Sequence, residues 1–152
     1  MPEKSRIRIT QIGGARETAL AAEARRWMKR EPRYCWLGEL SRASALTTLA
    51  RGRVMLISSV MEGGANVVSE ALMARVPVIA SRISGNVGML GKDYGGYYPA
   101  GNAKALARLL RRLETDPDLL PMLRRQCAVR RKLISRSGER LALRRLLREC
   151  TE

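Results

Sequence analysis

A glycine-containing loop flanked by two glutamates is the stretch of this sequence best suited to chemistry. Gly63 and Gly64 follow an apolar run at residues 54–57 and precede an amphipathic segment at 67–75. Glycine lacks a Cβ, so its backbone can turn sharply and approach a ligand closely. A helix that begins near Asn66 would offer free N–H groups and the positive end of its dipole, which suit a phosphate. The loop therefore predicts an anion site.

Two carboxylates bracket this loop. Glu62 lies at its mouth, and Glu70 follows after seven residues, about one turn inside the expected helix. Carboxylates are poor ligands for a phosphate but good acceptors for sugar hydroxyl groups, so the spacing predicts a phosphate flanked by sugars. From spacing alone, a tight turn followed by glutamates that favour the helix dipole accounts for the same residues equally well.

The elements that would position this loop alternate along the chain. Apolar runs at 54–57 and 78–80, separated by a helical segment, predict a βαβ unit with buried parallel strands. Alternation of this kind favours an α/β fold. Strands are expected at 6–12, 33–37, 54–57, 78–80 and 95–98, and helices at 17–29, 41–50, 67–75, 102–113, from 116, at 126–135 and at 139–149. Ser41 and Asn102 are predicted helix caps.

The expected architecture is one domain over residues 1–152, with an α/β core to about residue 115 and a basic helical tail over 116–152. The core is predicted to be a Rossmann-like parallel sheet with helices on both faces. The helix at 17–29 should bury Leu20, Ala24 and Trp27 or Met28 on one face. Open α/β sheets bind ligands beyond the carboxyl ends of their strands. Three loops are expected there, at 13–14, 38–40 and 58–66.

Composition narrows the classes of function. The net charge of +15, from 29 Lys and Arg against 14 acids, favours either a polyanion partner or an arginine-rich solvated surface, and no nucleic-acid motif accompanies it. The absence of histidine excludes His-based catalysis and the usual zinc sites, and no metal or cofactor is expected. Three widely spaced cysteines predict a reducing, cytoplasmic compartment. No signal peptide or membrane span is expected.

The motif from Glu62 through Gly63 and Gly64 to Glu70, followed by Pro77 and its apolar run, resembles the nucleotide-sugar site of GT-B glycosyltransferases. The retaining group 1, or family 4, type with its E-x7-E motif is the closest match. The segments SSVMEGGANVVSEA, GNVGMLG and DYGGYYP are similar to one branch, the selenosugar synthases of selenoneine biosynthesis. That branch implies UDP-N-acetylglucosamine as donor and selenophosphate as acceptor.

The resemblance assigns roles to residues of this chain. Glu62 would meet the donor sugar, as the catalytic carboxylate, and Glu70 would hold the ribose hydroxyls. Two loops complete the expected donor site, which needs no metal. The amides of Gly63, Gly64, Ala65, Asn66 and Val67 would meet the diphosphate and sugar, and Gly38, Glu39 and Leu40 would lie near the base. Without the family, Gly38 is better explained as an ordinary turn glycine.

Departures from the family pattern limit this expectation. The family usually has glycine where Arg75 stands and glutamate where Gly88 stands, and the branch has acid and proline at Arg82 and Ser84. The acceptor domain and the first strand of the donor domain have no counterpart here. The leading hypothesis is the donor-binding half of a glycosyltransferase. A basic module for nucleic acid and an inactive remnant are the alternatives, and a missing domain or partner chain is the expected protein partner.

Overall fold

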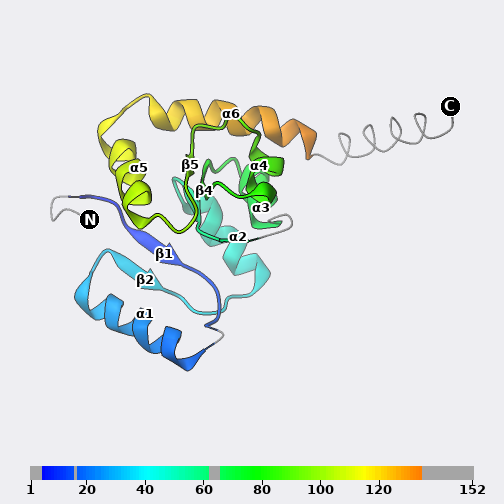
Figure 1. Ribbon diagram of the computed structural model, residues 1–152. Helices are drawn as coiled ribbons and strands as arrows, with labels where there is room; N and C mark the ends of the chain where they lie inside the picture. Colours follow the sequence, from blue (N-terminus) through cyan, green and yellow to red (C-terminus); the bar gives the residue numbers. More distant parts are fainter. Residues whose placement is uncertain (1–4, 16, 62–65, 135–152) are drawn as a thin grey trace, which may run out of the picture. The chain divides into compact units, whose positions relative to one another are not determined.

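The computed structural model describes residues 5–15, 17–61 and 66–134, in which five strands and six helices alternate. They belong to two compact units, an N-terminal unit (Met1–Arg51) and a C-terminal unit (Gly52–Glu152). Every strand pair in the described residues is parallel. The predicted α/β architecture with parallel strands is therefore confirmed (Figure 1). That all 152 residues form one nucleotide-sugar-binding domain stays a prediction.

The N-terminal unit is a βαβα segment whose two strands pair with Ile9 opposite Tyr34. The second helix begins where the sequence predicts, because the Ser44 N–H donates to the Ser41 hydroxyl at 3.3 Å and so caps the first turn. The elements of the N-terminal unit are β1 (Ile9–Gln11), α1 (Thr18–Arg30), β2 (Tyr34–Trp36) and α2 (Arg42–Arg51).

The apolar face predicted for α1 is only partly correct. Ala24 is buried, and α1 packs against β2. Leu20 and Trp27, however, are each 51% exposed, and Met28 is 37% exposed. Helical periodicity identifies a face, but it does not say whether anything covers that face. In the described residues the outer part of the stripe stays in contact with solvent.

The C-terminal unit is built on a three-stranded sheet in the order β3-β4-β5. All four residues of β4 are buried, so both faces of this strand are covered. The helix α6 runs across α3, α4 and α5 and packs against each (Figure 1). The elements are β3 (Met55–Ile57), α3 (Asn66–Met73), β4 (Val78–Ser81), α4 (Ser84–Leu90), β5 (Tyr97–Tyr98), α5 (Ala103–Thr115) and α6 (Leu119–Leu133).

Helix ends in this unit follow local hydrogen bonds. Asn102 caps α5 as predicted, since its side chain accepts from the Ala105 N–H at 2.9 Å. The separate helices expected from 116 and at 126–135 are wrong, because α6 is one continuous helix from Leu119. Pro121 lies in its first turn, where a missing N–H costs nothing. The helix predicted at 139–149 lies outside the described residues.

Helix α3 ends in a left-handed residue that is not glycine. Arg75 has φ +61°. Its N–H donates to the Leu72 carbonyl at 3.1 Å, and the Val76 N–H donates to the Ala71 carbonyl at 2.9 Å. These two bonds form a Schellman motif, whose left-handed position favours glycine. The resemblance to the family predicts glycine here, and the backbone of Arg75 now supplies the physical reason.

We therefore expect Arg75→Gly to stabilise the chain. Relief of the left-handed strain exceeds the added flexibility of the unfolded chain, for a net gain of roughly 0.5–1 kcal/mol. Urea unfolding measures the change. Arg75→Ala is the control, because it removes the charged side chain but keeps the Cβ and should give no gain. Equal stabilisation by both variants would contradict this account.

Candidate functional site

The predicted site centres on the loop between β3 and α3, and the described residues include its two ends. Glu62, Gly63, Gly64 and Ala65 lie outside the described residues, so their roles stay predictions. On the strand side, Met61 is 87% exposed. On the helix side, the residues from Asn66 onward are helical, as the sequence predicts.

Helix α3 positions the remaining predicted residues by the face that it buries. Val68, Ala71 and Leu72 are almost completely buried and anchor the helix in the core. Asn66 and Val67, which precede this anchored face, are exposed. Glu70 is the fifth residue of α3, about one turn inside the helix, and is half-buried. Its position therefore agrees with the predicted spacing, and its contact with a ribose stays a prediction.

A buried polar network ties together the carboxyl ends of β3 and β4. The Ser81 hydroxyl, at the end of β4, donates to the Ser59 carbonyl at 2.5 Å. The Asn86 side-chain amide donates to the Ser81 carbonyl at 2.8 Å and reaches the Ser81 hydroxyl at 3.3 Å. Ser81 and Asn86 are completely buried. The network fixes the start of the loop that carries the predicted site. In the sequence, its only sign is a polar residue, Ser81, at the end of an apolar run.

Within the part of the chain that the structure describes, one buried side-chain atom lacks a hydrogen-bond partner, the Asn86 Oδ1. Buried amide oxygens normally accept at least one hydrogen bond. The atom belongs to the first turns of α4, directly after β4. This carboxyl edge is the edge at which open α/β sheets bind ligands.

Helix α4 is held from its far end by α6. The Arg130 side chain donates from Nε to the Met89 carbonyl at 2.8 Å and from Nη2 to the Gly88 carbonyl at 2.5 Å. These bonds satisfy carbonyls of the last turn and place a cation at the negative end of the helix dipole. A Cβ at Gly88 would meet nothing within 4 Å. Steric crowding therefore does not explain why this chain lacks the glutamate that the family has there.

The two tyrosines of β5 hold neighbouring backbone groups in place. The Tyr97 hydroxyl donates to the Asn86 and Gly91 carbonyls at 3.1 and 3.0 Å. Burial raises the pKa of Tyr97 to about 12, although Arg82 and Arg130 act to lower it. The Tyr98 hydroxyl donates to the Ile57 carbonyl at 3.3 Å, and burial raises its pKa as well.

The other two predicted loops meet within the N-terminal unit. The Gly13 N–H donates to the Gly38 carbonyl at 2.8 Å. Gly38 has φ +67°, a value that requires glycine-like freedom. Glu39 lies beside Gly14, with Oε2 3.6 Å from the position that a Cβ there would take. The turn interpretation of Gly38 is thus sufficient, and the proximity of Gly38, Glu39 and Leu40 to a nucleotide base stays a prediction.

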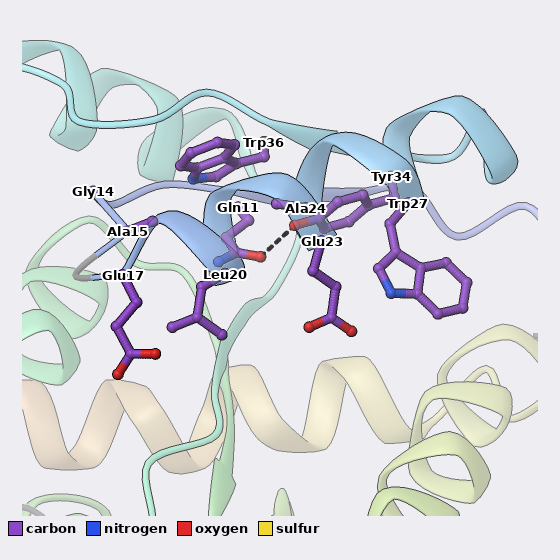
Figure 2. A pocket seen from close by; sticks show the side chains of 10 residues that line it. All are labelled: Gln11, Gly14, Ala15, Glu17, Leu20, Glu23, Ala24, Trp27, Tyr34 and Trp36. Atoms are coloured by element: carbon purple, nitrogen blue, oxygen red, sulfur yellow. Dashed lines mark hydrogen bonds between the residues drawn. The ribbon is translucent and has the colours of Figure 1, made fainter.

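A hollow of about 500 Å³ lies in the N-terminal unit between α1 and the two strands (Figure 2). The Tyr34 hydroxyl bonds to the Gln11 side chain at 2.6 Å on its floor. None of the residues predicted to bind the donor lines this hollow. Its lining consists of Gln11, Gly14, Ala15, Glu17, Leu20, Glu23, Ala24, Trp27, Tyr34 and Trp36. Alternation of side chains along the strand expected at 6–12 predicts β1, but it does not predict a hollow beside that strand.

Other site types have little support in the described residues. No group of three or more carboxylate, thiol or imidazole side chains there is arranged to hold a metal ion. None of the described helices combines the length and the apolar character needed to cross a bilayer. Cys35 and Cys127 are free thiols, and burial raises the pKa of Cys127.

Comparison with known proteins gives a family and a fold. Residues 3–130 match the family model described as glycosyl transferases group 1. A search of curated proteins found no significant match. Crystal structures of Anabaena Alr3699/HepE with UDP and with UDP-glucose are similar, at 19% and 18% identity and TM-scores of 0.73 and 0.72. Sucrose-phosphate synthase from Thermosynechococcus elongatus is 22% identical, with a TM-score of 0.69.

These matches cover nearly all of this chain but a minor part of the others. The two HepE matches cover 90% and 89% of this chain but only 40% and 39% of the HepE chains. The synthase match covers 93% of this chain and 38% of the synthase chain. The predicted Rossmann-like half of a GT-B fold is confirmed by this likeness.

We expect Ser81→Ala to destabilise the C-terminal unit by about 1–2 kcal/mol, because it removes buried hydrogen bonds at the carboxyl edge. Thermal unfolding followed by circular dichroism measures the loss. Ser58→Ala is the matched control, since Ser58 is exposed in the same loop and should change stability little. If the two variants unfold alike, the Ser81 network does not hold this edge together.

Proposed function

The chain belongs to the glycosyl transferases of group 1, and from this premise we propose that it binds the UDP-sugar donor for hexosyl transfer. The observation that carries the proposal is the position of α3. Its first described residue, Asn66, follows β3 through a short loop, so the helix begins at the carboxyl side of a parallel sheet. This is where such sheets bind ligands and where a helix offers its N–H groups.

In the proposed site the diphosphate lies against the amides that open α3. An acceptor atom forms a new bond to the sugar C1 as the bond between C1 and the diphosphate oxygen breaks, and the electron pair of the broken bond leaves on the departing UDP as negative charge. Fixed backbone dipoles stabilise that charge. Glu70 accepts from the ribose hydroxyls, and Glu62 accepts from the donor sugar. The family resemblance supports these two roles, and the half-buried position of Glu70 on α3 is compatible with its role.

The similar HepE structures contain UDP or UDP-glucose, which supports a uridine nucleotide for this chain. The resemblance to the selenosugar synthase branch supports a narrower pair of substrates, UDP-N-acetylglucosamine as donor and selenophosphate as acceptor. The absence of any paired cysteine motif supports a cytoplasmic location.

Glu70→Ala is expected to weaken UDP binding about tenfold or more, because it removes charge-assisted hydrogen bonds to the ribose. Isothermal titration calorimetry with UDP measures this. Asp93→Ala is the control, since it removes an exposed carboxylate from the same unit and should bind as the parent does. The titration should be unchanged by EDTA, because the proposed site uses no metal ion. Unchanged affinity in the Glu70 variant would refute the assignment.

For the narrower proposal, we expect UDP release when the chain, supplied with an acceptor domain, meets UDP-N-acetylglucosamine and selenophosphate. Mass spectrometry should detect the sugar joined to selenium. Inorganic phosphate in place of selenophosphate is the control for the acceptor. UDP binding without any selenium-containing product would remove selenophosphate as the acceptor and leave donor binding intact.

A further inference from the structure

One face of α6 holds the connection between α4 and β5 through side-chain hydrogen bonds. The Gln126 side chain donates to the Asp93 carbonyl at 3.1 Å and accepts from the Gly95 N–H at 3.0 Å. One turn later, the Arg130 guanidinium donates to two carbonyls in the last turn of α4. Helix α6 also packs directly against α4 (Figure 1). The position of α4 therefore depends on α6.

Helix α4 has little stability of its own. It has seven residues, and no side chain caps its N-terminus. A helix of this length is not stable alone in water, so tertiary contacts decide where it lies. Arg130 supplies a charge-assisted contact, with Nε 2.8 Å from the Met89 carbonyl oxygen and Nη2 2.5 Å from that of Gly88. Because two nitrogens of one rigid guanidinium donate together, they fix both the location and the orientation of this helix end.

The opposite end of α4 is bonded to the start of the predicted donor loop. The Asn86 amide donates to the Ser81 carbonyl at 2.8 Å, and the Ser81 hydroxyl donates to the Ser59 carbonyl at 2.5 Å. Ser59 lies three residues before Glu62. Ser81 and Asn86 have no exposed surface, and close-packed interiors transmit strain. A shift of α4 would therefore reach the start of this loop through two bonded side chains.

We infer that Arg130 is a positioning residue for donor binding. It acts through α4, Asn86 and Ser81 on the start of the loop, and it makes no contact with the donor itself. The inference rests on the proposed function, because that proposal assigns the loop to the UDP-sugar. The two directed bonds of the guanidinium are what position α4, and a positive charge alone is not sufficient.

Two variants of Arg130 separate the bonds from the charge. Arg130→Met keeps a long unbranched side chain but removes both donors, and Arg130→Lys keeps the charge but has one nitrogen in place of the fork. Both should weaken UDP binding by about three- to tenfold, within the range of effects measured along coupled contacts. Isothermal titration calorimetry on the full chain measures this. Arg125→Met is the control, since Arg125 is exposed on the same helix and should bind UDP as the parent does.

A double-mutant cycle tests whether Arg130 and Ser81 act through one path. Arg130→Met and Ser81→Ala should each weaken UDP binding, and the double variant should bind little more weakly than the weaker-binding single variant. Independent sites would instead give fold-changes that multiply. In the chain without UDP, the amide resonance of Ser59 should also move in NMR spectra of Arg130→Met.

Asn102→Ala separates positioning from a general loss of stability. It removes the side-chain cap of α5 in the same unit and should lower the midpoint of urea unfolding. Because α5 lies outside the path, the UDP affinity and the Ser59 resonance should stay those of the parent. Circular dichroism should show that every variant is folded.

Four results would overturn the inference. They are a UDP affinity of Arg130→Met equal to that of the parent, full rescue by lysine, fold-changes of the Arg130 and Ser81 variants that multiply, and a loss of affinity in Asn102→Ala as large as that in Arg130→Met. When the parent binds UDP, each of them rejects the positioning role and leaves donor binding intact. Failure of the parent chain to bind UDP would reject the proposed function and this inference together.

Discussion

The complete burial of β4 is the constraint on which the C-terminal unit depends. Its residues Val78–Ser81 have no exposed surface, and β3 and β5 pair with its two edges. Water cannot reach the N–H and C=O groups of such a strand, so the protein must satisfy them. β5 has only two residues and is too short for this. At Val78 the Tyr94 hydroxyl takes the place of a strand, accepting from the N–H at 3.1 Å and donating to the carbonyl.

The Tyr94 hydroxyl, which here does the work of a paired strand, constrains the residues around it. Burial raises the pKa of Tyr94, so its hydroxyl keeps the proton that it donates to the Val78 carbonyl. A Cβ at Gly96 would lie 2.6 Å from that carbonyl and from the Tyr94 ring, which explains the glycine. Cys127 of α6 lies 3.4 Å from the same hydroxyl. At the other end of β4, a side chain again satisfies a backbone group, since the Ser81 hydroxyl donates to the Ser59 carbonyl at the start of the loop of the predicted donor site.

The sequence was sufficient for the five strands and for the caps of α2 and α5, but not for the continuous helix α6 or for long-range partners. Apolar runs locate β3 and β4 within one residue, and Asn102 caps α5 as expected, because these signals are local. The role of Tyr94 depends on a backbone group 16 residues away, and the exposure of Leu20 on what covers its helix. Neither has a local signature. For the candidate site, the helical start of α3 was predictable, whereas the roles of Glu62 and Glu70 rest on family resemblance.

Charge shows why position carries more information than composition. The total of +15 favours a polyanion partner and a solvated surface alike. Part of the excess, however, serves internal contacts, since the side chain of Arg33 bonds to Glu31 and that of Arg130 bonds to the carbonyls of α4. Near the hollow of the N-terminal unit, too, a cation packs against the protein itself, since the guanidinium carbon of Arg25 lies 5.7 Å from the centroid of the Trp36 ring. The global excess of positive charge is therefore no indication, by itself, of a nucleic-acid partner.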